Sequence, residues 1–490
     1  MLEKIEVYVR KCFWGPFLIG FIGYFFLDGG SNGESLNLLE AFYASAALYF
    51  VNPVSNNSNV CIMIAKIMAL VVTADFILSV ISSSLDSMSH WFAKMNKDST
   101  AIYTDTELGE KIVLTAKHAY VSKSGKVEDT NDHIIMFNDD AANLCFYENN
   151  REFFSKPDRR VFIGLNHIDS ALLSSSKDSN VRYFCLDEIR ARSYWRTYNL
   201  YNALNKDKAF KIAIVGWNAI GKSIFKQGYL NNIYEINQTI EYHIWECDSY
   251  EKQFLENLKF ENNDKVMVHT LNYKEEWDQI IDMDRIIIAK DEPIEMVQDL
   301  IRTNGRYKIY CSMEGNQDLS VIFNSNKIYM FGNLEKLLTI DNIKSERIYL
   351  QAKLVNYDYD LRCEDKKKKG EQKYKDCLPD KYEEKMEESW SKLDGFLKGS
   401  NMARADYYWI EKKNLDKNIS ENERCKLEHI RWCRYYYYNG WKYATGNKDN
   451  LNRTHPDLVV YEDLPQDEKK KDGIYNSEIE KKLGELDGRI

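Results

Sequence analysis

Residues 212–225 read IAIVGWNAIGKSIF, and this stretch decides the fold expected for the middle of the chain. Four apolar residues run directly into Gly216, and a helical pattern that contains Gly221 follows. A strand, a glycine turn and a helix in this order are typical of the unit that opens a parallel, doubly wound sheet. The stretch therefore predicts an α/β domain whose ligands would meet the chain at the turn after the strand.

Short apolar segments alternate with helical stretches on both sides of this turn, which is the pattern of a parallel α/β fold. We predict a second Rossmann-like unit over residues 206–361 and a degenerate first unit over residues 131–205, with a linker at 101–130. The first unit has the polar residues NDD at 138–140 where glycines would stand, so we expect it to be scaffold. The predicted strands are residues 133–137, 161–165, 181–185, 211–215, 240–245, 266–270, 285–289 and 308–311.

A dinucleotide-binding turn uses one glycine for the turn, a second for the approach of the pyrophosphate and a third for helix packing. Gly216 and Gly221 occupy the first and third places, whereas Asn218 occupies the second. Glu246 and Asp248 end the next predicted strand, where an acidic residue would bind a ribose. We predict a nucleotide site at these five residues, and the alternative is a degenerate unit that binds nothing.

The first hundred residues contain two apolar runs with an interrupted apolar segment between them. Their lengths predict membrane spans at 12–27 and 60–85 around a pore helix at 35–51. Lys and Arg flank the runs but are absent from residues 28–59, so the positive-inside rule places both termini in the cytoplasm. We predict an all-α two-helix membrane pore at residues 1–100, and the alternatives are a cleaved signal peptide and a buried hairpin in a soluble protein.

Five residues are predicted to line the ion path. Residues 49–52 stand where a selectivity filter would lie, and they include no glycine. Filter glycines allow the dihedral angles that turn carbonyls inward, so we expect weak discrimination between potassium and sodium. A charge inside an apolar span is costly, and Asp75 is expected either to line the pore or to pair with Lys66. The predicted pore residues are Tyr49, Phe50, Val51, Asn52 and Asp75.

The composition excludes several classes of function for the chain. Its formal net charge of −9 at pH 7 disfavours a general nucleic-acid coating surface. The ten cysteines are scattered without a CxxC pair, so disulfides and structural zinc are not expected. The sequence has no P-loop, nucleophile elbow or metal-ligand spacing. We therefore predict no catalytic residues, no metal and no enzymatic activity.

The C-terminal region carries an ordered series of polar and aromatic motifs. We predict a charged linker at residues 362–389 and a mainly α domain at residues 390–490. The motifs are SNMARAD at 400–406, LEHIRW at 427–432, NGWKY at 439–443 and HPDLV at 455–459. Aromatic side chains of this kind either stack on a nucleobase or fill a small helical core, and both alternatives stay open for the tryptophans. The predicted ligand-binding residues are Glu428, His429, Arg431, Trp432, Trp441 and His455.

Each part of the chain resembles a known family. The C-terminal series resembles the RyR domain, the module repeated in ryanodine receptors and found singly in many bacterial proteins. Residues 212–224 belong to paired strand–turn–helix units that follow the two apolar runs in the sequence. They resemble the regulator of potassium conductance (RCK, TrkA-N) family. Residues 38–53 resemble the pore helix of tetrameric cation channels. The RCK resemblance implies a ring of paired Rossmann units.

Together these resemblances imply a homotetrameric, ligand-gated ion channel in the bacterial inner membrane, in contact with lipid and acting in defence against phage. The pairing of Rossmann and RyR modules resembles bacterial conflict systems, which implies a nucleotide or oligonucleotide ligand made by an enzyme encoded elsewhere. No cofactor is certain. The alternatives are a housekeeping potassium channel or transport regulator that senses NAD or ATP, and a membrane-anchored interaction protein that conducts no ions.

Overall fold

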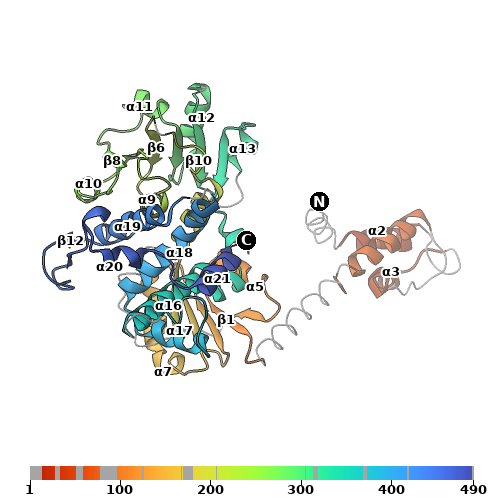
Figure 1. Ribbon diagram of the computed structural model, residues 1–490. Coiled ribbons are helices and arrows are strands. Elements are labelled where there is room, and N and C mark those ends of the chain that lie inside the picture. The colour runs from red at the N-terminus through yellow and green to blue at the C-terminus, as the bar shows by residue number, and fades with distance from the viewer. Residues whose placement is uncertain are drawn as a thin grey trace. The chain divides into compact units, whose positions relative to one another are not determined.

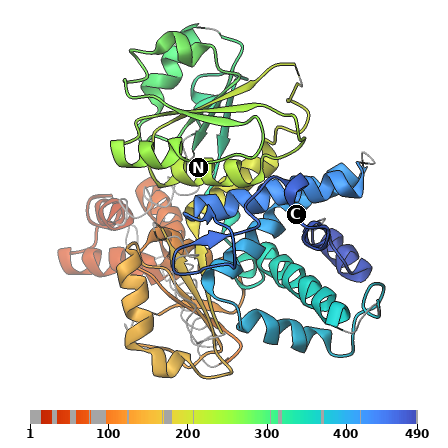
Figure 2. The same cartoon turned by 60° about the vertical axis from the view of Figure 1, so that its left-hand side comes forward.

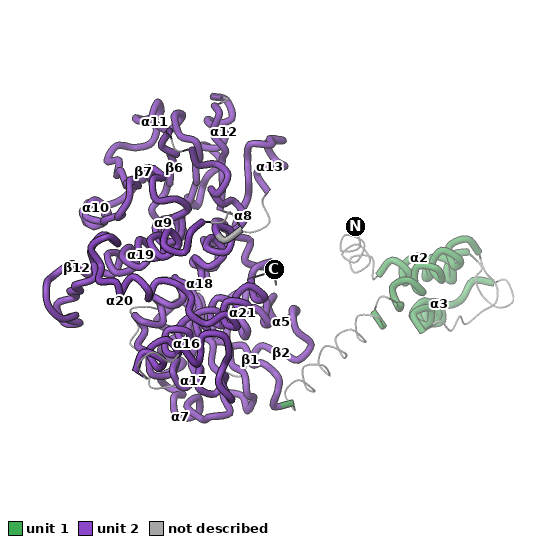
Figure 3. The backbone as a smooth tube through the Cα atoms, viewed as in Figure 1, with its two compact units in different colours: residues 1–96 green, residues 97–490 purple. Residues whose placement is uncertain are grey.

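A computed structural model of the chain shows two compact units, residues 1–96 and residues 97–490 (Figure 3). In its described residues the first unit is helical, and the second carries two parallel sheets surrounded by helices (Figure 1). The structure describes residues 14–27, 34–50, 59–74, 76–77, 96–122, 126–166, 168, 180–205, 207–303, 305–312, 318–367, 372–416 and 419–487.

The helices of the first unit are short. α2 spans Gly15–Phe26 and α3 spans Leu38–Ala47. At a rise of about 1.5 Å per residue the 12 residues of α2 reach about 18 Å, whereas the core of a bilayer is about 30 Å thick. Among the described residues, none of the helices is both long enough and apolar enough to cross a membrane. The predicted two-helix membrane pore, with spans at 12–27 and 60–85 around a pore helix at 35–51, is therefore wrong.

Two of the predicted pore residues lie in the described part of the chain. Tyr49 and Phe50 belong to η1 (Leu48–Phe50), a single 3-10 turn that directly follows α3. The Tyr49 carbonyl accepts a hydrogen bond of 2.8 Å from the Thr73 hydroxyl, and the Phe50 side chain is 83% exposed. Without the pore, none of the five residues has an assigned function. The other three, Val51, Asn52 and Asp75, lie outside the described residues.

The first unit is held together by small side chains. α2, α3 and the helix that begins at Val60 share a core in which Ala41, Ala44 and Ala65 are fully buried against Tyr24. Small residues let helix backbones approach closely, which suits three short helices. Large apolar side chains on the outer faces of these helices remain exposed, among them Leu39 and Val60.

The first sheet of the second unit lies in the N-terminal part of that unit. Its elements are β1 (Thr100–Tyr103), α5 (Glu107–Val113), β2 (Ala119–Val121), β3 (Asp132–Ile135), α6 (Asp140–Asn149), α7 (Arg151–Phe154), β4 (Arg160–Leu165) and β5 (Val181–Cys185). All strands are parallel, in the order β2-β1-β3-β4-β5, which is the doubly wound order of flavodoxin-like folds. Residues 101–130, for which the sequence predicted a linker, contribute most of β1 together with α5 and β2.

The second sheet has the strand order of a Rossmann fold. Its elements are β6 (Phe210–Val215), α9 (Ala219–Asn231), β7 (Ile240–Trp245), α10 (Ser249–Glu256), β8 (Lys265–Val268), α11 (Trp277–Ile281), β9 (Arg285–Ile288), α12 (Ile294–Thr303), β10 (Lys308–Ser312), α13 (Leu319–Ile322) and β11 (Ile328–Phe331). The order β11-β10-β9-β6-β7-β8 is 6-5-4-1-2-3 in chain order, and its strands pair in parallel. The structure thus contains the two parallel α/β sheets that the alternation of segments predicted.

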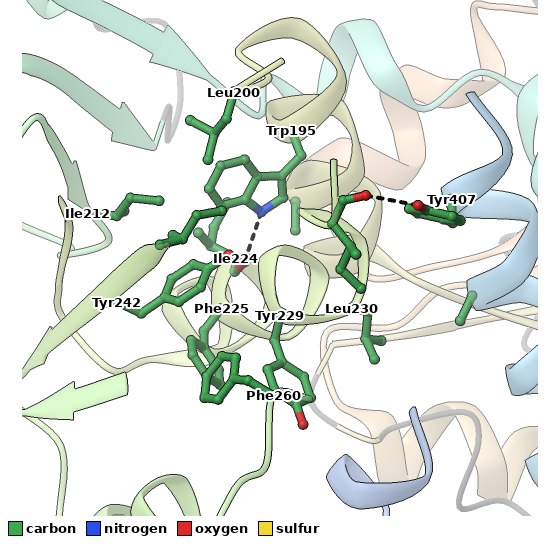
Figure 4. Packing of buried hydrophobic residues seen from close by; sticks show 14 of the residues in the cluster. Trp195, Leu200, Ile212, Ile224, Phe225, Tyr229, Leu230, Tyr242, Phe260 and Tyr407 are labelled. Carbon is green, nitrogen blue, oxygen red and sulfur yellow. Dashed lines mark hydrogen bonds between the residues drawn. The ribbon is translucent and has the colours of Figure 1, made fainter. Parts of the chain in front are cut away.

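Helix α8 (Leu186–Thr197) joins the two sheets and packs against α9. Trp195 of α8 is 3% exposed, and its indole donates a hydrogen bond of 2.9 Å to the Ile224 carbonyl (Figure 4). Ile212 and Tyr242 of the second sheet belong to the same buried cluster. Tyr407 reaches this region from the C-terminal helices and donates to the Ile233 carbonyl at 2.8 Å.

The remaining helices surround the two sheets. They are α14 (Leu334–Leu337), α15 (Ile340–Lys344), α16 (Arg347–Lys367), α17 (Tyr382–Ser391), α18 (Gly395–Asp416), α19 (Glu421–Tyr438), α20 (Gln466–Lys469) and α21 (Ser477–Asp487), with a short ladder between β12 (Lys442–Tyr443) and β13 (Thr454–His455). The predicted charged linker at 362–389 contains the end of α16 and most of α17. In Figures 1 and 2 the blue helices α18 and α19 lie directly against the green second-sheet region, with which both share a core.

Candidate functional site

A cavity of about 500 Å³ opens among α16, α18 and α19, and we call it the α19 cavity. Five of the six ligand-binding residues predicted for the C-terminal region line it. Glu428, Arg431 and Trp432 follow each other at helical spacing on α19, so one face of that helix forms a wall of the cavity. The five predicted residues that line the α19 cavity are Glu428, His429, Arg431, Trp432 and His455.

One wall of the α19 cavity is aromatic. The rings of Trp432 and Tyr436 lie 4.3 Å apart between centroids, and the His455 ring stands edge-on to Trp432 at 5.1 Å. Trp432 is only partly buried, whereas Tyr436 is 4% exposed. Such a partly open ring at a cavity wall can stack on a flat ligand.

Trp441, the sixth predicted residue, lies in the core of the C-terminal helices and is not among the residues that line the α19 cavity. It is 6% exposed, and its ring stacks on Phe396 with 5.4 Å between centroids. The preceding Gly440 has a φ of +77°, a left-handed conformation that glycine adopts without strain. This turn directs the chain from α19 into the β12–β13 ladder.

The inner end of the α19 cavity holds a buried arrangement of two arginines around one glutamate. Arg431 donates two hydrogen bonds to the Glu428 carboxylate, from Nε at 2.8 Å and from Nη2 at 2.7 Å. Arg404 of α18 forms an ion pair of 2.6 Å with the same carboxylate. Arg431 is 1% exposed, and its Nη1 has no hydrogen-bond acceptor among the described residues. A buried donor that lacks an acceptor costs free energy, which makes Arg431 a candidate ligand-binding residue of the cavity.

His429 is held between two acceptors. Its Nε2 lies 2.8 Å from the Val459 carbonyl and its Nδ1 lies 3.5 Å from an Asp472 carboxylate oxygen. Burial disfavours the charged ring, but the Asp472 carboxylate and the Val459 carbonyl outweigh burial and raise the pKa of His429. Burial also raises the pKa of Asp472, and His429 partly offsets that change. His429 is thus predisposed to be the imidazolium partner of Asp472.

His455 has the opposite environment. Burial, with the positive charge of Lys448 adding to it, lowers the pKa of His455 to about 4. Its Nδ1 accepts a hydrogen bond of 3.1 Å from the Asp457 backbone, which leaves the proton of the neutral ring on Nε2. The two histidines of the α19 cavity therefore have pKa values that are shifted in opposite directions.

The sequence did not single out several residues that line the α19 cavity. Arg404 and Asp472 complete the buried ion pairs, although Arg404 does stand within the SNMARAD motif. The others come from segments far apart in the chain, and only Asn401, which also stands in the SNMARAD motif, belongs to a motif quoted above. They include Asn356, Asp358, Tyr359, Asn401, Tyr436, Lys448 and Lys471.

The second predicted site lies at the carboxyl ends of β6 and β7. Gly216 has a φ of +101°, and a Cβ on Gly221 would meet the Gly216 carbonyl oxygen at 2.2 Å, so both glycines are required for the turn. The Asn218 side chain accepts a hydrogen bond of 3.1 Å from the Gly221 backbone and so caps α9. The structure places the predicted glycines and Asn218 together as a strand–turn–helix junction.

The two predicted acidic residues of this second site also have structural contacts. Glu246 has a φ of +66° and forms a 2.5 Å ion pair with Lys290, which follows β9. Asp248 accepts a hydrogen bond of 2.8 Å from the Glu251 backbone and caps α10. A ribose at this edge of the sheet would have to compete with these contacts for both carboxylates.

Comparisons with known proteins leave the family of this chain open. No protein-family model matches the chain, and no curated protein matches it. One solved structure, the crystal structure of a GsuK mutant, is similar to it with a TM-score of 0.34 and 8% sequence identity. That similarity covers 71% of this chain and 100% of the other chain. A similarity of this size shows neither the fold nor the function of this chain.

Proposed function

We propose that this chain is a ligand sensor whose α19 cavity binds a nucleotide-type ligand. The observation that carries the proposal is a cavity of about 500 Å³ that combines an aromatic wall with a buried arginine nitrogen that lacks an acceptor among the described residues. Small-molecule sites have volumes of about 300–1,000 Å³ and combine apolar walls with a few convergent polar groups.

The parts of the α19 cavity match the parts of a nucleotide. A base stacked on Trp432 and Tyr436 gains about 1–3 kcal/mol, because every base presents an aromatic face. Nη1 of Arg431 can donate to a carbonyl oxygen of the base or to a phosphate oxygen. Lys448 also lines the cavity and provides positive charge for phosphates, whereas Lys471 is already paired with Glu468. The ligand therefore binds with its base on the aromatic wall.

Helix α19 connects the ligand to the second sheet. Arg431 faces the cavity, and Arg434, about one helical turn further along, is buried against the second sheet. A ligand that binds one position of α19 more tightly than another would shift the conformation of this junction. The second sheet is thus the part of the protein that responds to ligand binding.

The output we propose is regulation of ion transport at the bacterial inner membrane by a homotetramer, in defence against phage. The resemblance of residues 212–224 to TrkA-N units and of the C-terminal motifs to RyR domains supports this output. The exposed apolar side chains on the helices of the first unit support contact with lipid or with other subunits. The nucleotide or oligonucleotide signal would come from a separate enzyme.

Calorimetric titration of the full chain with ATP, NAD and cyclic di-AMP tests the sensor. We expect one of these probes to bind, and Trp432→Ala to raise its Kd about 5- to 150-fold, which corresponds to the 1–3 kcal/mol of one stack. Asp248→Asn, at the second predicted site, is the matched control and should leave the Kd unchanged. If none of the probes binds, or if only Asp248→Asn weakens binding, the α19 cavity is not the sensor.

The transport output is tested separately in cells that express the full chain. We expect a bound nucleotide to change the membrane potential in cells with the wild type but not in cells with Trp432→Ala. A response of equal size in both strains would contradict the link between the α19 cavity and transport.

A further inference from the structure

A second cavity of about 490 Å³ lies between α8, the α14–α15 segment and the start of α16, and we call it the α8 cavity. It shares no lining residue with the α19 cavity. Most of its wall is apolar and is formed by two stretches of the chain, residues 184–189 of β5 and α8 and residues 337–348 from α14 to α16. These residues are Phe184, Ile189, Leu337, Leu338, Ile343 and Ile348.

The charged residues of the α8 cavity fall into two groups. Arg192 is surrounded by carboxylates, because it forms ion pairs with Glu188, Glu346 and Asp406. These carboxylates hold its charge within a closed network, and Glu346 also pairs with Arg182. The positive charge of Arg192 is therefore already neutralised by carboxylates of the protein, and Arg192 is not expected to bind a ligand anion.

Arg196 and Arg347 form the second group, and they share one carboxylate. Asp487, near the end of α21, forms an ion pair with Arg196, and it lies 3.9 Å from Arg347 Nη1. Nε of Arg347 is buried and has no acceptor among the described residues. Two guanidinium groups thus line the cavity. Asp487, which is not among the lining residues, is the one carboxylate of the described residues that pairs with both of them, so the two positive charges share a single negative charge.

We propose that the α8 cavity binds a small amphiphilic anion. Its apolar body lies against Leu337, Leu338 and Ile343, and its single carboxylate or phosphate group pairs with Arg196 and Arg347, which together have only Asp487 as a carboxylate partner in the described part of the chain. A neutral apolar ligand would cover the two guanidinium groups of the wall without adding a second anion. A ligand with several charges would have to bury them against the apolar wall, which costs free energy. The combination of one anion and a hydrocarbon or aromatic body fits both parts of the cavity.

One wall of the α8 cavity is formed by helix α8, which joins the two sheets. Ile189, Ser193 and Thr197 line it at intervals of four residues, so a ligand would lie along one face of α8. Trp195 on the same helix bonds to the Ile224 carbonyl of α9. A ligand here would contact the helix that joins the first sheet to the second.

Calorimetric titration of the full chain with octanoate, octyl phosphate and octanol tests this proposal. These probes share an apolar chain and differ in the head group. The anion that binds more tightly shows whether the natural ligand carries a carboxylate or a phosphate. We expect saturable binding of at least one of the two anions, at least tenfold tighter than octanol. Equal Kd values for anions and octanol, or no saturable binding, would overturn the proposal.

Three variants locate the binding. Arg347→Gln should reduce the preference for the anion over octanol at least fivefold, and Ser193→Trp should abolish binding of all three probes by filling the cavity. Arg302→Gln changes an exposed arginine outside the cavity and should leave every Kd unchanged. If Ser193→Trp does not fold, Leu337→Trp fills the same space. Anion binding that persists in a folded filling variant would place the ligand elsewhere.

Discussion

Nη2 of Arg434 lies 2.8 Å from a carboxylate oxygen of Asp264, and neither side chain has any exposure to solvent. The same guanidinium donates to the carbonyls of Phe260 and Tyr229, both at 2.9 Å. One arginine on α19 therefore satisfies backbone and side-chain acceptors of the second-sheet region. This contact makes the C-terminal helices and the second sheet one folded unit.

We predict that Arg434→Met destabilises the protein by about 3–5 kcal/mol, because it leaves the Asp264 carboxylate buried without its cation. Urea denaturation monitored by circular dichroism measures the change in the free energy of unfolding. The double variant Arg434→Met, Asp264→Asn should recover part of the loss, because it removes the buried charge as well. A loss below about 1 kcal/mol in the single variant would contradict this role for the pair.

Local sequence signals predicted the second sheet because its opening turn is a local feature. Gly216, Asn218 and Gly221 lie within six residues, and the structure uses each of them to turn the chain or to start α9. The sequence pattern did not predict the first two strands of the first sheet. β2 has only three residues, but β1 has four, as do the predicted strands β3, β8 and β9, so length alone does not explain the difference for β1. All four residues of β1 are buried between β2 and β3, and a local pattern does not contain these neighbours.

The first unit shows a second limit of sequence patterns. An apolar run gives the hydropathy of a segment but not the length of the helix that forms in it, and α2 covers 12 residues of the run at 12–27. In the α19 cavity, the motif on α19 predicted Glu428, Arg431 and Trp432, which share one helix face. Asp472, which lies after α20, could not be predicted, because its contact with His429 arises only in the folded chain.

We predict that Gly221→Ala destabilises the protein by about 1–3 kcal/mol, because its Cβ would meet the Gly216 carbonyl oxygen at 2.2 Å. Gly484→Ala is the matched control: this glycine lies within helix α21, and the nearest atom to its Cβ would be 3.7 Å away. The control should stabilise the protein by up to about 1 kcal/mol through helix propensity. Thermal or urea unfolding of both variants checks the prediction, and equal effects would contradict the close packing at Gly216.

His133 should make stability depend on pH at mildly acidic pH. Burial, helped by the charge of Arg159, lowers its pKa from 6.5 to about 4. Between these two pH values the unfolded chain binds a proton that the folded chain excludes, so stability is lost as pH falls. From these two pKa values, His133 alone should lower the free energy of unfolding by about 3 kcal/mol as the pH falls from 6.5 to 4.

Urea unfolding of the wild type and of His133→Phe across this pH range isolates that contribution. The stability advantage of the wild type over the variant should shrink as the pH falls. His118→Gln, a change at an exposed histidine, serves as the control. An advantage that stays constant from pH 6.5 to pH 4 would show that His133 is protonated equally in both states.

His429 should make the protein more stable at acidic pH, which is the opposite of the effect of His133. Although burial opposes its charge, the Asp472 carboxylate and the Val459 carbonyl raise its pKa, so the folded chain binds the proton more tightly than the unfolded chain. Its contribution is fully present below the ordinary pKa of 6.5 and is lost as pH rises through the higher folded pKa. His429→Gln should therefore cost more stability at pH 6 than at pH 9.

His455→Gln should cost less stability at pH 6 than at pH 9. The pKa of His455 is lowered to about 4, so in the wild type the folded chain excludes a proton that the unfolded chain binds at pH 6. Parallel pH profiles for the two variants would contradict the assignment.

The two tryptophans of the C-terminal motifs should separate stability from ligand binding. Trp441 is 6% exposed and stacked on Phe396, so Trp441→Ala should cost about 3–5 kcal/mol of stability. Trp432 is partly buried at the wall of the α19 cavity, so Trp432→Ala should cost less stability and raise the Kd of the bound nucleotide. Urea unfolding and calorimetric titration of both variants, below the unfolding transition of each, measure the two effects. If Trp441→Ala weakens binding as much as Trp432→Ala while it remains folded, both rings contact the ligand, and the aromatic wall extends beyond Trp432, Tyr436 and His455.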